Sequence, residues 1–322
     1  MKELTFYALI VALTLFGAAA GAQQIYPNKP VRFVVGYPPG GATDIIARTI
    51  AQKLTDGLGQ QVLVDNRPGA GGIIGSEIVA KATPDGHTIV LVTTSHGVNP
   101  SLYGKLPYDT LTSFAPVIHV ASLQLVLVVN PSLPAKSVKD LIALAKAKPG
   151  QLNFASSGSG QSLHLAGELL KTMAGIDIVH IPYKGSAPAR TDLLGGQVQM
   201  MFESMIGVLP FVQSGKLRAL AVSGAKRSPA APNIPTMAEA GVPGYQASGW
   251  VGVLAPAATP KPIIIRLNSE IDKVLKLPEV ADRLSNSGAE PAGGTPEQFA
   301  AFIRAEIAKW TRVVKLSGAR VE

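Results

Sequence analysis

The chain has 322 residues, of which 47% are hydrophobic and 16% charged, and this composition excludes a disordered protein. The length predicts two domains at about 150 residues each. Cysteine is missing, which excludes a disulfide scaffold, a thiolate metal site and a cysteine nucleophile. The net charge is +8, but no basic run stands out and aromatic residues make up only 6%. We therefore expect small anionic solutes rather than nucleic acid as partners.

Residues 1–22 have the pattern of a secretory signal peptide. Lys2 precedes an apolar stretch over residues 4–16, and small residues follow as far as Ala22. The stretch is about 13 residues long, whereas a membrane span requires about 20. We predict cleavage before Gln23, or alternatively after Ala20, and export of the mature protein.

The next segments alternate between strand and helix patterns, which predicts a parallel α/β sheet. A strand at 31–35 leads through a Pro- and Gly-rich turn at 38–41 into a helix over 43–58. A strand at 62–64, a glycine-rich turn at 67–72, a helix as far as Lys81 and a strand at 89–92 follow. The long β-branched run at 117–129 can connect two lobes.

The same alternation continues in a second set of segments. It comprises a helix over 137–148 with Ser137 as N-cap, a strand at 153–155, a glycine-containing turn at 156–160 and a helix over 162–173, then the segments 176–181, 187–194, 198–202 and 217–222. Residues 226–244 form a connector, residues 250–254 return the chain to the first lobe, and helices follow over 263–275 and 296–315. No internal repeat is evident. The chain is expected to form two α/β lobes, 23–123 plus 248–322 and 124–247, with a ligand cleft between them.

Three glycine-rich turns, over residues 37–43, 67–72 and 156–162, each follow a predicted strand and precede a predicted helix. Free backbone N–H groups and a helix N-terminus then converge on one point, which suits an anion. The alternative is that these residues only make tight connections. Asp44 either pairs with the helix dipole or contacts water or a ligand amine. Lys184 and Arg190 either face an acidic solute or are solvated.

Sequence signatures of catalysis and cofactor binding are missing. The chain contains no complete G-x-G-x-x-G, G-x-x-x-x-G-K-[ST] or G-x-S-x-G pattern. Its five histidines, at positions 87, 96, 119, 164 and 180, lack metal-ligand spacing. We expect no catalytic residue, no metal and no cofactor, with His164 and His180 packed near the cleft.

Several motifs occur together in a specific order. They include VGYPPGGATD at 35–44 with Arg48, NRPGAGG at 66–72, HIPYKG at 180–185 and PTMAEAG at 235–241. Over about residues 25–317 the sequence resembles the Bug family, the periplasmic receptors of tripartite tricarboxylate transporters. The resemblance implies a two-lobed receptor without enzymatic activity that closes on a small carboxylate and delivers it to membrane permease subunits.

The resemblance also implies which residues bind the ligand, largely through backbone amides, hydroxyls and bridging waters. In the first lobe they are Tyr37, Pro39, Gly40, Gly41, Ala42, Thr43 and Asp44; in the second they are Ser157, Gly158, Ser162, Tyr183, Lys184, Gly185 and Glu203. Ala42 replaces a serine that is frequent in the family. Glu203 replaces the usual aspartate, so its longer side chain is expected to reach further into the cleft.

Two other functions stay open at this point. The first is a sensor receptor without a transport partner. The second is a periplasmic hydrolase, which requires a serine within hydrogen-bond reach of a base. We expect a monomer that binds a small aliphatic or aromatic acid.

Overall fold

The computed structural model describes residues 26–286 and 288–317. The predicted signal peptide, residues 1–22, lies outside them. Within the described part of the chain, no helix combines the length and the apolar character that a membrane span requires.

The described residues form one mixed sheet of ten strands, in the order β2-β1-β3-β9-β4-β7-β5-β6, with β8 and β10 both paired to β4. The strands are β1 (Val31–Val35), β2 (Val62–Asn66), β3 (Thr88–Thr93), β4 (Phe114–Val129), β5 (Asn153–Ser156), β6 (Val179–Pro182), β7 (Met200–Ser204), β8 (Arg218–Val222), β9 (Ser248–Pro256) and β10 (Ala289–Gly293). The helices are α2 (Ala42–Leu58), the short η1 (Ala70–Gly72), α3 (Ile73–Ala80), α4 (Thr94–Leu102), α5 (Val138–Ala147), α6 (Ser162–Ala174), α7 (Ser186–Leu194), α8 (Met205–Gln213), α9 (Lys261–Lys276), α10 (Pro278–Ser285) and α11 (Pro296–Ser317).

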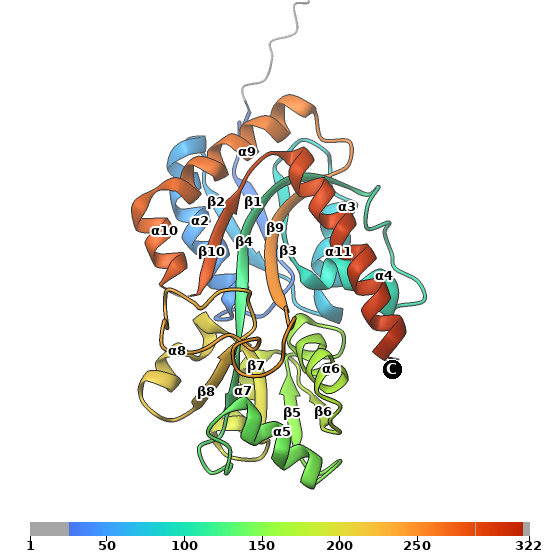
Figure 1. Cartoon of the computed structure of the whole chain (residues 1–322). Helices are drawn as coiled ribbons and strands as arrows, with labels where there is room; N and C mark the ends of the chain where they lie inside the picture. The colour runs from blue at the N-terminus through green and yellow to red at the C-terminus, as the bar shows by residue number, and fades with distance from the viewer. Residues whose placement is uncertain (1–25, 287, 318–322) are drawn as a thin grey trace, which may run out of the picture.

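The sheet divides into two lobes that share strand β4, which runs from the upper into the lower half of Figure 1. β4 pairs with β9 as far as Gln124 and with β7 from Leu125 onward. One apolar core contains only residues between 125 and 247, and two others contain only residues outside that range. We call residues 26–124 and 248–317 the first lobe, and residues 125–247 the second lobe.

Strand direction differs from the sequence prediction in the middle of the sheet. β1 pairs in parallel with β2 and β3, and β5 with β6 and β7. β4 is antiparallel to β7, β8, β9 and β10. The predicted parallel arrangement therefore holds within each set of alternating strands but not in the middle of the sheet, because β4 and β9 carry the chain between the lobes in opposite directions.

Alternating side chains of the first-lobe strands form two separate cores. Val31, Phe33 and Val35 pack in the core that includes α2 and α9, whereas Val34 packs in the core that includes α3 and α11. This alternation follows from the two-residue period of a strand. Helices therefore cover both faces of the sheet and leave its strand ends open to the other lobe.

The two lobes repeat one topology. The first lobe runs β1-α2-β2-α3-β3-α4, and the second runs β5-α6-β6-α7-β7-α8. The strand orders β2-β1-β3 and β6-β5-β7 also correspond, so that β1 and β5 are the middle strands of their sets. In each lobe a helix begins just beyond the carboxyl end of every one of these strands, where α/β proteins bind their ligands.

Candidate ligand-binding site

Loops at the carboxyl ends of the two strand sets meet between the lobes. A Cβ added at Gly185, in the β6–α7 loop, would lie 4.0 Å from Pro38 Cγ in the β1–α2 loop. A Cβ at Gly160, in the β5–α6 loop, would overlap Leu102 at the end of α4. A Cβ at Gly249 in β9 would lie 3.7 Å from the Ser162 hydroxyl. The predicted ligand loops of both lobes therefore lie at one interface.

Helix N-termini at this interface have free backbone donors. The N-cap residues of α2, α6 and α7 are Gly41, Gln161 and Gly185, and within the described residues no side chain caps any of these three helices. First-turn N–H groups lack an acceptor inside the helix, and the helix dipole adds positive potential at the same point. Ala42 and Thr43 begin α2, and Ser162 begins α6. These positions can donate hydrogen bonds to an anion.

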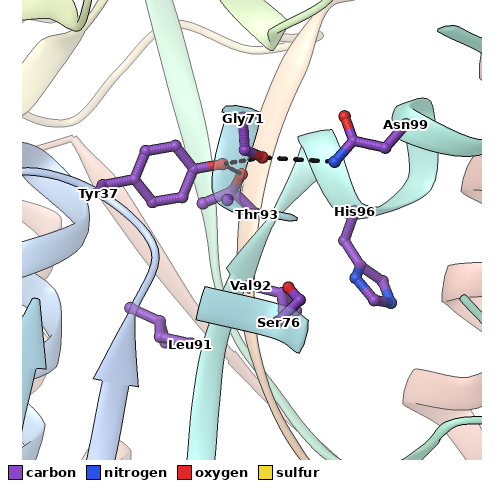
Figure 2. Close-up of a pocket in the computed structure, with 9 residues that line it drawn as sticks. Tyr37, Gly71, Ser76, Leu91, Val92, Thr93, His96 and Asn99 are labelled. Atoms are coloured by element: carbon purple, nitrogen blue, oxygen red, sulfur yellow. Dashed lines mark hydrogen bonds between the residues drawn. The ribbon is translucent and has the colours of Figure 1, made fainter. Parts of the chain in front are cut away.

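The hydroxyl of Tyr37 bonds within its own lobe. It lies 2.6 Å from Thr93 Oγ1 and donates to the Gly71 carbonyl at 3.3 Å, where Asn99 also donates at 3.4 Å (Figure 2). Burial raises the pKa of the Tyr37 phenol. The adjoining cavity of about 10 Å³, which Ser76 also lines, has room for about one water. Tyr37 thus joins the three loops that follow β1, β2 and β3.

Thr93 and Asn99 belong to this cluster and were not predicted from the sequence, whereas Gly71 lies in the predicted glycine-rich turn at 67–72. Thr93 caps α4 by accepting a hydrogen bond from the Ser95 N–H at 3.3 Å. A Thr-Thr-Ser run after a buried strand is a helix-start signal. Gly97 and Pro100 inside α4 conceal it, because both residues disfavour a helix interior.

Asp44 accepts hydrogen bonds from its own lobe. Its carboxylate accepts from the Gly40 N–H at 2.9 Å, from Asn66 Nδ2 at 3.0 Å and from Arg48 Nε at 3.0 Å. Burial raises the pKa of Asp44, but the hydrogen bonds from Arg48, Gly40 and Asn66 outweigh burial and leave the pKa below its usual range. Asp44 therefore supports the β1–α2 loop as an anion, and its predicted ligand contact stays a prediction. Pro39 is exposed on the same loop.

In the second lobe, backbone hydrogen bonds connect the β5–α6 loop to the β6–α7 loop. The Tyr183 N–H donates to the Ser156 carbonyl and the Gly185 N–H to the Ser157 carbonyl, both at 3.1 Å. Gly158 has a φ of +139°, which an L side chain rarely adopts. The predicted residues Ser157, Gly158, Tyr183 and Gly185 thus form one connected surface.

The side chains on this surface differ in whether they already make hydrogen bonds within the second lobe. The Ser157 hydroxyl donates to Gln161 Oε1 at 2.9 Å, and the Tyr183 hydroxyl donates to Asp192 at 2.7 Å. Burial and the Asp192 carboxylate raise the pKa of Tyr183 to about 12. Lys184 is exposed. This exposure fits both predicted roles of Lys184, contact with an acidic solute and solvation, so its ligand contact stays a prediction.

A stacked histidine pair supports the β5–α6 loop. The rings of His164 and His180 lie 3.8 Å apart, and His180 Nε2 lies 2.6 Å from the Ser156 hydroxyl. Burial and the neighbouring His164 lower the pKa of His180 to about 3. This Ser–His contact has the distance that the hydrolase alternative requires. Ser156 is 0% exposed, however, so its hydroxyl cannot reach an external carbonyl.

Glu203 is buried at the end of β7, with 2% exposure. One carboxylate oxygen accepts from the Ser204 N–H at 2.8 Å, and the other lies 3.4 Å from Arg190 Nη1. Burial raises the pKa of Glu203, and Ser204 and Arg190 offset part of that shift. The carboxylate therefore bonds beneath the interface, and the reach that we predicted for it stays untested. Across the described residues, no group of three or more His, Asp and Glu side chains could hold a metal ion.

Comparison with known proteins identifies the family. Residues 46–319 match the model of the tripartite tricarboxylate transporter family receptor. Protein BugT of Bordetella pertussis is 43% identical, and the alignment covers 98% of each chain. The chain belongs to this receptor family.

Two solved structures of similar proteins have the same fold as this chain. The Rpa4515 protein of R. palustris, solved with adipate, is 41% identical and superimposes with a TM-score of 0.89 over 92% of this chain and 100% of its own. MatC of Rhodopseudomonas palustris, solved with bound malate, is 32% identical, with a TM-score of 0.84 over 90% of this chain and 100% of its own. The receptor fold with two α/β lobes is thus confirmed, and the proteins it resembles are solute-binding proteins.

Proposed function

We propose that this receptor captures a small carboxylate between its lobes in the periplasm and delivers it to a tripartite-type membrane transporter. The observation that supports this most directly is the meeting of uncapped helix N-termini from both lobes at one interface. These ends combine free amide donors with positive dipole potential. Membership of the receptor family supplies the transport context.

The ligand class that fits this arrangement is an aliphatic dicarboxylate. The start of α2 in the first lobe can receive one carboxylate, and the starts of α6 and α7 in the second lobe can receive the other. Two of the similar receptors hold such acids, adipate in one and malate in the other.

Binding is expected to shift a population between an open and a closed arrangement of the lobes. Only β4 and the segment that enters β9 cross between the lobes within the described residues, and these crossings provide the hinge. A diacid that bonds both lobes binds the closed arrangement better and favours it. The protein acts as an exported monomer whose signal peptide, residues 1–22, has been removed.

The test is a thermal-shift screen of the processed protein, purified from the periplasm and then unfolded and refolded to remove any copurified ligand. The panel contains adipate, malate, aromatic acids and the neutral diamides of the same acids. A ligand at 100 times its Kd adds about 2.7 kcal/mol, or about 5–10 °C at this size. A shift with diacids and none with diamides supports the proposal, whereas a flat panel contradicts it.

Proline substitutions sharpen this test by removing single amide donors. Proline is accepted at the first position of a helix, and both Ala42 and Ser162 occupy that position. The residues before them, Gly41 and Gln161, have the extended backbone that precedes proline. Ala42→Pro should therefore weaken diacid binding by about tenfold, because it removes one charge-assisted hydrogen bond. Ser162→Pro should weaken it at least as much, because it removes the hydroxyl together with the N–H. Ala42→Gly retains the N–H and serves as the control.

Two further measurements separate the alternatives. Turnover of small esters by the processed protein would favour the hydrolase, and Ser156→Ala would then abolish it. Uptake of the bound acid by cells with and without the receptor distinguishes transport from sensing, because a sensor-only receptor leaves uptake unchanged.

A further inference from the structure

The loops that precede α2 and α6 have the same backbone conformation. Gly40 and Gly160 have φ values of +77° and +74°. The N-caps that follow them have φ/ψ of −83°/168° at Gly41 and −83°/164° at Gln161. The first helical hydrogen bonds, from the N–H groups four residues after each N-cap, are both 3.0 Å long. The two helix starts therefore correspond residue by residue, with an offset of 120.

Corresponding side chains also accept the same backbone proton. The Gly40 N–H donates to Asp44 Oδ2 at 2.9 Å, and the Gly160 N–H donates to His164 Nδ1 at 2.9 Å. In both cases the acceptor is the third residue of the helix, four positions after the glycine. No sequence similarity between Asp and His indicates this equivalence.

We propose that Asp44 and His164 are equivalent positioning residues, each of which fixes its glycine loop so that the following first-turn amides remain free for the ligand. A loop glycine that lost this acceptor would have an unsatisfied N–H, and the loop would rotate to satisfy it. The ligand part of this proposal rests on the proposed function. The loop part does not, because it concerns contacts made without ligand.

The two acceptors respond differently to acid. Asp44 is held as a carboxylate by Arg48 and Asn66, and it accepts as long as it is ionised. His164 accepts this hydrogen bond only while Nδ1 is unprotonated. A proton on Nδ1 would make it a donor that faces the Gly160 N–H, which is also a donor.

The groups around His164 come from three elements. His180 of β6 stacks on it at 3.8 Å, and Phe154 of β5 stacks at 6.2 Å. Glu168 of α6 lies 3.7 Å from Nε2 and also bonds Lys171. Protonation of Nδ1 would therefore remove the acceptor of the Gly160 N–H, whereas the Gly40 N–H would keep Asp44 as its acceptor.

The decisive experiment is a backbone amide NMR titration of the processed protein without ligand. As the imidazole takes a proton, we expect the Gly160 N–H to lose its downfield shift and to exchange with solvent about tenfold faster, the loss of about one hydrogen bond. The Gly40 N–H should stay unchanged over the same pH range. Equal behaviour of the two amides, or no response at Gly160, would overturn the proposal.

Variants at position 164 test the role of Nδ1 itself. The side-chain oxygen of asparagine can occupy the place of Nδ1, whereas leucine offers no acceptor. His164→Asn should keep the Gly160 N–H protected and independent of pH, and His164→Leu should leave it unprotected at every pH. If both variants behave alike, His164 has no positioning role. Thermal unfolding of each variant verifies that it is folded.

Binding of adipate and malate provides the functional readout. We expect His164→Leu to weaken binding about tenfold and His164→Asn to stay within about threefold of the parent, as expected for one hydrogen bond. Asp44→Leu, which removes the acceptor of the Gly40 N–H, should behave like His164→Leu. If neither acid binds the parent protein, the proposed function fails, and the NMR titration still decides the proposal for the loops.

Discussion

The two lobes use one backbone arrangement with different side chains. In the first lobe a charged network of Asp44, Arg48 and Asn66 supports the loop before α2. In the second lobe the stacked pair His164 and His180 supports the loop before α6. The difference shows that the shared loop conformation can be stabilised by two chemically different acceptors, a carboxylate and an imidazole.

The third strand of each set ends differently. Thr93 at the end of β3 caps α4, and Val92 before it is buried among apolar residues. At the end of β7, Ser204 bonds Glu203 and, within the described residues, does not cap α8. The second lobe thus places a buried carboxylate where the first has a valine. A buried charge of this kind persists only when it is paired, here with Arg190.

Acid should destabilise both lobes, and this is the largest effect that we expect. Burial lowers the pKa of His96 in the first lobe to about 4, and burial together with His164 lowers that of His180 in the second lobe to about 3. Below the unfolded value of about 6.5, the unfolded chain binds protons that the folded chain refuses. The free energy of unfolding should fall as the pH decreases from 6.5, by on the order of 3 kcal/mol at pH 4 for the buried His96 and by less for the half-buried His180. Urea unfolding at a series of pH values measures this slope.

Single substitutions assign the slope to the lobes. His96→Gln and His180→Gln should each reduce the proton uptake on unfolding between pH 6.5 and 4 by about one. Glutamine retains a group near Nε2, which in His96 bonds the Thr110 carbonyl and in His180 contacts Ser156. A slope that survives both substitutions would show that other groups cause the acid sensitivity.

The lobes also touch through an apolar contact that α6 makes. Leu165 of the second lobe packs against Val98 of α4 and Trp310 of α11, and it is 0% exposed. Figure 1 shows α11 descending beside the sheet to the level of α6. Leu165→Ala should remove about 3 kcal/mol of packing free energy, as for other buried leucines. Because the contact joins the two lobes, this loss should destabilise their closed arrangement. We expect weaker diacid binding and a changed environment of Trp310.

Fluorine NMR with 5-fluorotryptophan measures that environment directly, because the chain has only two tryptophans. The signal of Trp310 should move towards its solvent-exposed position in Leu165→Ala. Leu170→Ala is the matched control, since Leu170 is also 0% exposed but packs inside the second-lobe core. A Trp310 signal that moves in both variants would contradict an interlobe role for Leu165.

The order of strands and helices was predicted well where the periodicity of the hydrophobic residues and the positions of the glycine-rich turns indicate the same element boundaries. The long β-branched run at 117–129 is the crossing strand β4, and the turns at 37–43 and 156–162 precede α2 and α6. The repeat of the two lobes could not be predicted, because it consists of strand order and backbone conformation. Asp44 and His164 share no chemistry that a sequence comparison would detect.

The sequence indicated which loops carry the candidate site residues, but not which partners their side chains contact. The Tyr37 hydroxyl meets Thr93 from a strand 56 positions away, and nothing local indicates such a pair. The Glu203 carboxylate bonds its neighbour Ser204 and the distant Arg190, and the latter pair is not evident from the sequence. These contacts depend on how loops from different strands converge, which residue spacing does not determine.

Removing one hydroxyl should produce the smallest effect. Tyr37→Phe removes the contacts with Thr93 and Gly71, and should cost about 1 kcal/mol of stability. Because those contacts connect three loops of the first lobe, diacid binding should also weaken, by about threefold.

Tyr245→Phe is the matched comparison for this loss. The Tyr245 hydroxyl donates to the Ala166 carbonyl at 2.7 Å inside the second-lobe core. Its removal should cost a similar free energy of unfolding without changing the Kd for adipate. Calorimetric unfolding and titration of both variants separate the two quantities. If both tyrosines alter affinity equally, the hydroxyl of Tyr37 acts through general stability, and the loops of the first lobe do not need it to hold their positions.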